Sequence, residues 1–268
     1  MNEYQLSLVF FTVLTQWSIG SVFAVTLYRS LSTSAQLFGL WNPREVAACI
    51  WLVCFIGSLC SLGHMGNPAN AIYALRGLGH SWLSREVLAF LVLNSFMSLW
   101  MLSHFVEIKQ SIQQLLGAAT AITGFIAILV SAQIYYQLTH HTEWNTALTH
   151  FAFVSTALVL GLATLIVFLT ASELSIPALI RNLLGLSVLM SFIVLLLLSQ
   201  VTGAAGSSHL IWYQVFGTVL VGLMLFMMAS TVKDHYPGAI LIAMLVMVSG
   251  EVVGRMSFYS SVMSKVPW

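Results

Sequence analysis

A chain of 268 residues that is 59% hydrophobic and only 6% charged cannot fold as a water-soluble domain, because such domains carry about 25% charged residues. Its formal net charge of +1 also excludes nucleic acid and other acidic polymers as partners. The composition therefore predicts an integral membrane protein.

Eight windows are apolar enough, and at about 20 residues long enough, to cross a bilayer as helices. All five prolines lie outside these windows, as expected of residues that begin and end helices. The first window lacks the basic flank and cleavage site of a signal peptide, so we expect it to be retained. We predict one all-α domain over residues 1–268, a bundle of eight transmembrane helices at roughly 5–28, 46–64, 86–104, 115–137, 148–170, 181–200, 210–231 and 238–258.

An even number of spans places both termini on one side of the membrane. With the termini outside, five Lys and Arg residues fall on the inner side (Arg29, Arg44, Lys109, Arg181 and Lys233) and four on the outer side (Arg76, Arg85, Arg255 and Lys265). Inner loops carry the excess of positive charge in membrane proteins. The count therefore predicts both termini on the outer side of the membrane.

Polar residues within or next to the spans gather on the side of the termini. The alternation of the spans places one group there: His64, Glu86, Gln133, Tyr135, Tyr136, His150, Glu251 and Arg255. The opposite side carries His104, Glu107, Lys109, Lys233 and Asp234, without a comparable run inside the helices.

The segment "SLGHMGNPANAIYALRGLGHSWLSREVLAF", residues 61–90, contains five ionisable residues between two apolar runs. Gly-Asn-Pro predicts a turn, and Ser81 or Ser84 is expected to cap the following helix. Two interpretations remain open for the flanking pair. His64 is either an exposed loop histidine or a proton acceptor, and Glu86 is either a first-turn carboxylate favoured by the helix dipole or a functional acid.

Glu251 and Arg255 are the only charged residues well inside a predicted span. They stand four residues apart, so they share one helical face. They either neutralise each other as a structural pair or mark a functional path, as ionisable residues in membrane helices usually do.

The functional hypothesis is that His64 and Glu86 flank a lipid-soluble redox ligand, a quinol. Oxidation of a quinol releases two protons, which a neutral imidazole accepts and a carboxylate passes on. Arg76 and Tyr135 or Tyr136 would orient the head group. The three cysteines form no CxxC pair, so no iron–sulfur cluster is expected in this protein. The histidines do not form the two matched pairs that a diheme protein needs, and the proline-free spans do not favour a transporter, the alternative function.

Four blocks of the sequence resemble the membrane anchor subunit of bacterial dimethyl sulfoxide reductase and related molybdoenzymes. They are "FFTVLTQWSIG", which contains Gln16, "SLGHMGNPANAIYALRGLGHSWLSRE", "IYYQLTHHTEW" and "GEVVGRMSFY". The second and fourth blocks are the specific ones.

The resemblance implies an anchor for anaerobic respiration that binds menaquinol and has no haem or metal centre of its own. It also implies a location in the bacterial cytoplasmic (inner) membrane, with both termini on the periplasmic side. It implies two partners, an iron–sulfur electron-transfer subunit and a molybdopterin catalytic subunit. By motif it assigns quinol oxidation to His64 and Glu86. We expect Gln16 to be a secondary lining residue of the site, and Glu251 and Arg255 to be a structural pair near it. We also expect no proton pumping, because the protons and the electrons of the quinol leave on the same side of the membrane.

Overall fold

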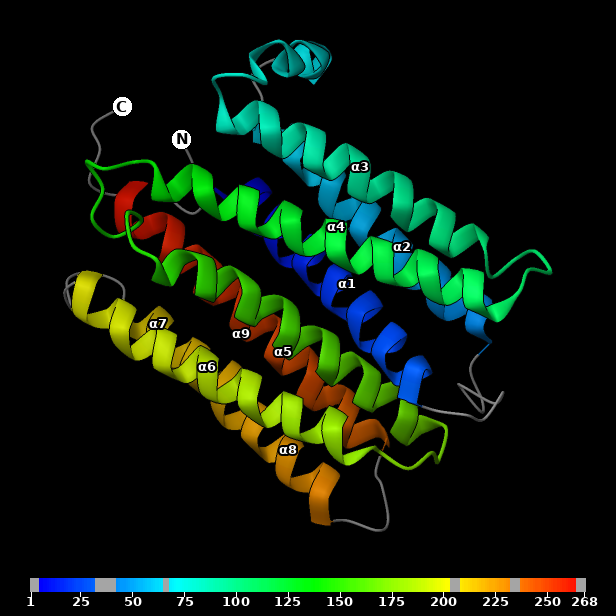
Figure 1. The fold of residues 1–268 in the computed structure, drawn as a ribbon. Helices are drawn as coiled ribbons and strands as arrows, with labels where there is room; N and C mark the ends of the chain where they lie inside the picture. Colours follow the sequence, from blue (N-terminus) through cyan, green and yellow to red (C-terminus); the bar gives the residue numbers. More distant parts are fainter. Residues whose placement is uncertain (1–4, 32–41, 65–67, 203–207, 232–236, 264–268) are drawn as a thin grey trace.

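The computed structural model describes residues 5–31, 42–64, 68–202, 208–231 and 237–263 (Figure 1). The elements run in the order α1 (Leu6–Leu31), α2 (Pro43–Cys60), η1 (Ser61–His64), η2 (Pro68–Gly77), α3 (Trp82–Leu102), α4 (Gln110–Tyr136), α5 (Leu148–Ala171), α6 (Ala178–Thr202), α7 (Ser208–Gln214), η3 (Val215–Leu220), α8 (Val221–Thr231) and α9 (Pro237–Met263). Within these described ranges, eight helical segments are long and apolar enough to cross a membrane, with α7, η3 and α8 together forming the seventh. The predicted all-helical fold with eight spans is confirmed.

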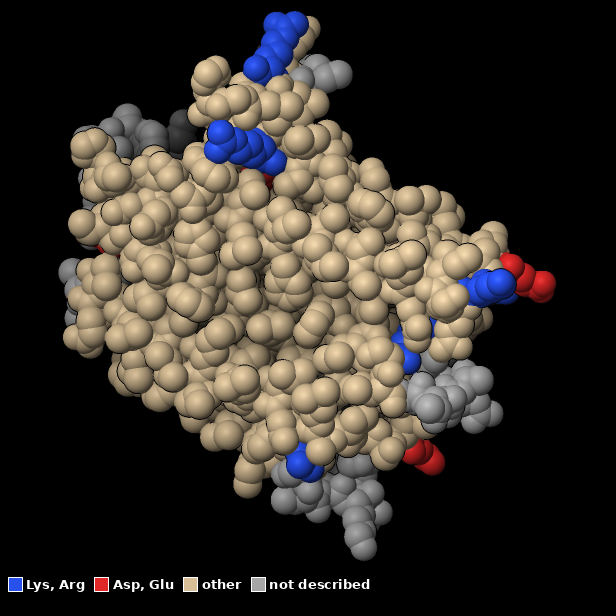
Figure 2. Space-filling view, in the orientation of Figure 1, with Lys and Arg blue, Asp and Glu red and all other residues tan. Residues whose placement is uncertain are grey.

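We call the end of the bundle where α1 begins and α9 ends the N/C end; it also holds the end of α2, the start of α3 and the η1–η2 segment (Figure 1). On the face drawn in Figure 2, charged side chains lie at the two ends of the bundle, with an uncharged band between them. This distribution matches a protein whose middle is surrounded by lipid.

Helix boundaries follow the expected signals with one difference that matters for the site. Pro43 is the first residue of α2, and the side chain of Asn42 caps that helix by accepting a hydrogen bond from the Arg44 amide at 3.1 Å. Ser81 caps α3, its side chain accepting from the Ser84 amide at 3.4 Å. The predicted start of this span at 86 is therefore wrong by four residues, and Glu86 lies in the second turn rather than at the helix terminus.

The centre of the bundle is the contact between α1 and α5, the two most deeply buried spans. Gly20 and Gly161 meet there so closely that a Cβ atom on Gly161 would lie 2.0 Å from the Gly20 carbonyl carbon. Small residues let membrane helices approach in this way. The contact fixes the position of α1 relative to α5. Gln16 of α1 and Thr156 of α5 both reach Arg255 on α9.

The seventh span departs from a regular helix. Residues Val215–Leu220 form a π-helical segment within it, which the apolar pattern of the sequence does not predict. Such segments occur frequently at functional sites. Here the segment places Gly217 against Gly250 of α9, where a Cβ on Gly217 would lie 3.0 Å from the Gly250 Cα.

Candidate functional site

A cavity of about 250 Å³ at the N/C end contains Glu86. It is enclosed by α1, α2, α3 and the two short helices η1 and η2. Its lining is apolar except for Glu86, Asn94 and two serines: Phe11, Ser58, Ser61, Leu62, Ala74, Leu83, Glu86, Val87, Phe90, Leu91 and Asn94.

One face of α3 supplies most of this wall. Its lining residues follow the spacing i, i+3, i+4, i+7, i+8 and i+11 from Leu83 to Asn94, which is the spacing of a single helical face. Glu86 lies on this face near the membrane boundary, and Asn94 lies about two turns deeper. The carboxylate is thus the charged group of an otherwise uncharged cavity.

The other polar groups of the cavity are paired with one another. Asn94 Nδ2 donates to Ser58 Oγ at 3.1 Å and to the Phe90 carbonyl at 2.8 Å, and Ser61 Oγ donates to the Ser58 carbonyl at 2.7 Å. The rings of Phe11 and Phe90 pack with their centroids 4.8 Å apart. The apolar walls are therefore rigidly packed and offer few competing hydrogen bonds.

The predicted partner of Glu86, His64, is the last residue of η1, and Ser61 and Leu62 of the same short helix line the cavity. Leu62, two residues before His64 in the sequence, is thus part of the cavity wall. The side chain of His64 lies outside the part of the protein that the structure describes, so its role stays a prediction.

Tyr135 connects Glu86 with the second half of the bundle. Its phenol oxygen is hydrogen-bonded to that of Tyr259 on α9 at 2.8 Å, and both phenols interact electrostatically with Glu86. Ser131 of α4 also approaches the Glu86 carboxylate, although Ser131 Oγ has no partner within hydrogen-bond distance among the described residues. That Tyr135 orients a head group stays a prediction, and Tyr259 is a neighbour that the sequence analysis missed.

An aromatic cluster holds Tyr135 in place. The rings of Trp144, Phe153 and Phe258 pack against it with centroid distances of 5.1, 5.7 and 5.3 Å. Trp144 Nε1 donates to the Phe258 carbonyl at 2.8 Å, which ties the connection between α4 and α5 to the end of α9.

Tyr136 and Arg76, the other residues predicted to orient a head group, do not line the cavity. Tyr136 is exposed, with its ring 5.4 Å from that of His150. Arg76 is exposed on η2 with its guanidinium 4.4 Å above the ring of Tyr73. Both remain at the N/C end, where they face outward.

Glu251 and Arg255 interact electrostatically, and both are hydrogen-bonded to the hydroxyl of Thr156. Thr156 Oγ1 donates to Glu251 Oε2 at 2.7 Å, and it accepts from Arg255 Nη2 at 3.3 Å. Arg255 Nη2 also donates to Gln16 Oε1 at 3.0 Å, and its guanidinium lies 3.8 Å from the centroid of Phe153. Gln16 therefore belongs to this buried cluster and is not among the residues that line the Glu86 cavity.

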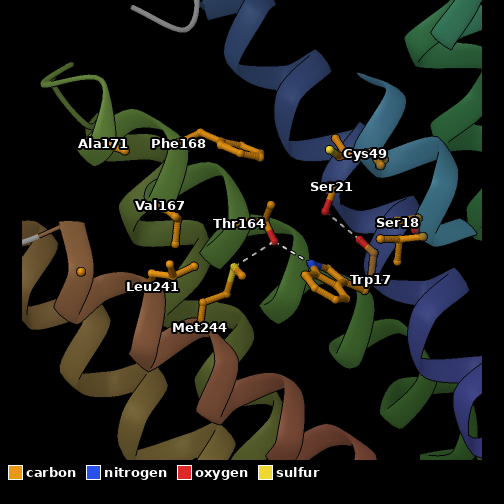
Figure 3. A pocket seen from close by; sticks show the side chains of 13 residues that line it. Trp17, Ser18, Ser21, Cys49, Thr164, Val167, Phe168, Ala171, Leu241 and Met244 are labelled. Carbon is orange, nitrogen blue, oxygen red and sulfur yellow. Dashed lines mark hydrogen bonds between the residues drawn. The ribbon is translucent and has the colours of Figure 1, made fainter. Parts of the chain in front are cut away.

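A second cavity, larger than the one at Glu86, lies at the opposite end of the bundle, between α1, α2, α5 and α9 (Figure 3). It measures about 390 Å³, and its lining contains no carboxylate, histidine, lysine or arginine. Trp17 Nε1 donates to Thr164 Oγ1 across it at 2.6 Å. A site there offers hydrocarbon contact but no acid–base group except the thiol of Cys49.

The opposite end also carries a buried basic pair that the sequence analysis did not assemble. Arg29 Nη1 and His104 Nε2 are 2.9 Å apart, while His104 Nδ1 lies 2.8 Å from the Trp100 carbonyl. Because arginine only donates and a carbonyl only accepts, His104 is neutral with its proton on Nδ1. Burial lowers the pKa of His104, the Trp100 carbonyl acts in the other direction, and the charge of Arg29 lowers it further.

Among the residues that the structure describes, no group of three or more His, Cys, Asp or Glu side chains is placed to hold a metal ion. The residues that sequence reasoning missed at the Glu86 cavity are Asn94, Ser58 and Phe11. A signal for the first was present, since Glu86, Phe90 and Asn94 follow one another at steps of four.

Comparison with known proteins identifies the family. Residues 1–261 match the model of the DMSO reductase anchor subunit (DmsC) family. The protein is 31% identical to the C chain of anaerobic dimethyl sulfoxide reductase from Haemophilus influenzae over 164 residues, which make up 59% of this protein and 56% of that relative. It is 26% identical to the YnfH chain of anaerobic dimethyl sulfoxide reductase from Escherichia coli over 269 residues, covering 94% and 93% of the two proteins.

A third relative shows that similarity extends to another oxidoreductase. The protein is 29% identical to the C subunit of sulfite dehydrogenase from Allochromatium vinosum over 156 residues, which make up 54% of this protein and 45% of that relative. The family match spans nearly the whole sequence and all eight spans, and it confirms the resemblance found in the sequence. The protein is a multi-pass bacterial membrane protein that belongs to the DMSO reductase anchor subunit (DmsC) family.

Proposed function

We propose that the cavity at Glu86 binds menaquinol, and that this anchor passes the electrons of the quinol to an iron–sulfur subunit. The observation that carries the proposal is one carboxylate on the wall of an apolar cavity at a membrane boundary. Oxidation of a quinol to a quinone releases two electrons and two protons, so the site must combine hydrocarbon contact with a proton acceptor near water.

The residues present fit such a ligand. Phe11, Phe90 and Leu91 supply apolar contact for the ring and the isoprenoid tail. Glu86 accepts a proton at its carboxylate, and His64, two residues beyond the cavity wall, is the proposed partner for a ring oxygen. Asn94 is fixed by Ser58 and Phe90 and sets the deep limit of the polar region.

The site lies on the proposed outer, periplasmic side, where the positive-inside count places both termini. An iron–sulfur subunit, itself bound to a molybdopterin subunit, would dock on the same end. The surface there carries exposed Arg76 over Tyr73, and Arg85 with its guanidinium 4.3 Å above Trp82. Arginine guanidinium groups and aromatic side chains, which attract each other through cation–π contacts, are enriched among the residues that contribute most to protein–protein binding.

The alternative functions fit less well. A transporter needs substrate-binding groups near the midplane and access from both faces, whereas the large cavity at the opposite end has no charged lining residue. A haem anchor needs paired free histidines. His104 is bound to Arg29 and Trp100, and His150 lies 3.0 Å from Gln133 Oε1.

Glu86→Gln tests the proposal in membranes that contain the assembled complex. We expect loss of quinol-driven reduction of the terminal acceptor by roughly a hundredfold or more, while a dye that reduces the catalytic subunit directly supports normal turnover. His64→Ala should behave in the same way. Glu107→Gln, at an exposed carboxylate of the opposite end, is the matched control and should keep wild-type rates. Quinol-driven turnover of Glu86→Gln at the wild-type rate, with normal assembly, would refute the assignment.

A further inference from the structure

Two small cavities, each with a few polar groups in a mostly apolar lining, adjoin one another in the second half of the bundle, away from the Glu86 cavity. The inner one, about 50 Å³, is lined by Glu251, Arg255 and Thr156. The outer one, about 60 Å³, reaches Glu143 in the connection between α4 and α5 and Ser261 near the end of α9. At about 30 Å³ per water molecule each has room for about two, and the polar groups in each lining can bind them.

The two cavities form one passage, because the same five residues line both: Leu195, Leu198, Gln214, Gly254 and Phe258. Glu251 lies twelve residues before Met263, the last residue of α9. At 1.5 Å per residue this places Glu251 about 18 Å from the N/C end. The passage thus leads from the interior of the bundle to the end that also bears the Glu86 cavity.

The junction between the cavities is formed by Gln214 lying flat on Gly254. A Cβ atom on Gly254 would lie 2.0 Å from Gln214 Cδ and 2.2 Å from both terminal atoms of its amide. The same amide approaches Glu251. Only the absence of a side chain at position 254 lets the amide of Gln214 occupy this position.

Glu251, which lines the inner cavity, has a neighbouring hydroxyl that is unpaired among the described residues. Thr218, in the π-helical segment η3, approaches Glu251, but its buried Oγ1 has no hydrogen-bond partner among the described residues. Buried hydroxyls are nearly always hydrogen-bonded to protein or to ordered water. A hydroxyl of this kind next to a carboxylate is typical of a hydrated site.

A series of neighbouring groups joins the passage to the Glu86 cavity. Glu86 interacts with Tyr135 and Tyr259, whose phenols share a hydrogen bond of 2.8 Å. Tyr259 in turn interacts with Arg255, which lines the inner cavity. The hydrogen bond of the series joins the two phenols, and Glu86 and Arg255 act on them through their charges.

We propose that this passage is the proton outlet of the quinol site, leading from Glu86 through the Tyr135–Tyr259 pair and the two small cavities to the surface at Glu143. The inference rests on the proposed function. The two electrons go to the docked subunit, and each proton moves by breaking one O–H bond and forming the next, so no oxidant is consumed. A subunit docked over the rim of the Glu86 cavity would close the direct exit, and a lateral outlet would remain open. Glu251 is a positioning residue that holds the water of the passage, and the amide of Gln214 sets the width of the junction.

Gly254→Ala tests the outlet, because the new methyl group displaces the end of a flexible side chain and narrows the junction. In the assembled complex we expect kcat for quinol-driven reduction to fall by roughly tenfold, with an unchanged KM for quinol. The ratio of the rates in H2O and D2O should rise, since proton release becomes limiting. Gly222→Ala is the matched control, because its Cβ would lie 2.8 Å from Val188 Cγ2 outside the passage. It should leave both the rate and the isotope ratio unchanged.

The double variant Gly254→Ala with Gln214→Ala separates blockage from damage. Removing the displaced amide reopens the junction, so the rate and the isotope ratio should return toward the wild-type values. Wild-type kinetics in Gly254→Ala, or a slow double variant, would overturn the outlet. If the proposed quinol site itself is wrong, the result differs: membranes that contain the wild-type complex show no quinol-driven turnover.

Discussion

Gly161→Ala should destabilise the whole bundle, because the close approach of α1 and α5 has no room for a methyl group. A Cβ at 161 would lie 2.0 Å from the Gly20 carbonyl carbon, whereas ordinary contact begins at 3.4 Å, a shortfall of 3.4 − 2.0 = 1.4 Å. The obstructing atoms are backbone, so the two helices must separate by about that distance. Overpacking of this kind costs about 3 kcal/mol or more.

The assay is thermal unfolding of the purified protein in a mild detergent. Gly238→Ala is the control, since a Cβ there meets nothing within 4 Å. We expect a clear fall in the midpoint temperature for Gly161→Ala and none for Gly238→Ala. The separation should also disturb Arg255, which is held by Gln16 of α1 and Thr156 of α5. Equal midpoints for Gly161→Ala and the wild type would refute the reasoning.

Two further predictions concern the opposite end of the bundle. The pKa of His104 in the fold lies below its ordinary value of 6.5, so the unfolded protein takes up a proton first as the pH falls below 6.5. The contribution of His104 to the free energy of unfolding should therefore be complete above pH 6.5 and decline as the pH falls toward the lowered pKa. The thermal unfolding midpoint of the wild type should fall between pH 7.5 and pH 5.5, and His104→Gln should lose the part of this fall that His104 causes. Thr164→Val removes the acceptor of Trp17 Nε1 and should cost about 1–3 kcal/mol. The same change in a Trp17→Phe background should cost much less, and an equal cost in both backgrounds would contradict this account.

The sequence was sufficient for the number of spans and for the end of the bundle at which polar residues meet. Hydropathy determines the first, because a helix in lipid must be apolar over its length. The end at which the polar residues meet follows from the alternating direction of successive spans, without knowledge of how the helices pack. The helix starts were less predictable, since α3 begins at Trp82, and Ser81 and Ser84 were equally good caps before the structure was known.

Sequence reasoning singled out some residues of the candidate site, but it could not predict how the helices pack against one another. Glu86 could be singled out because a charge at a membrane boundary is conspicuous in a protein with so few. The neighbours on other helices could not be found, because Ser58 and Phe11 become lining residues only through the rotation of α2 and α1. The same limit hid the role of Gln16, which belongs with Arg255.

The buried charge at Arg255 shows how the two halves of the protein depend on each other. A guanidinium in lipid is costly unless it is paired and hydrogen-bonded. Here α1 supplies Gln16, α5 supplies Thr156 and Phe153, and Glu251 balances the charge through Thr156. Because breaking a buried pair leaves an uncompensated charge, a change on any of these three helices alters the field at Tyr259 and, through the Tyr135 hydrogen bond, at Glu86. The contact between α1 and α5 is therefore both the mechanical centre of the bundle and the support of its proposed proton chemistry.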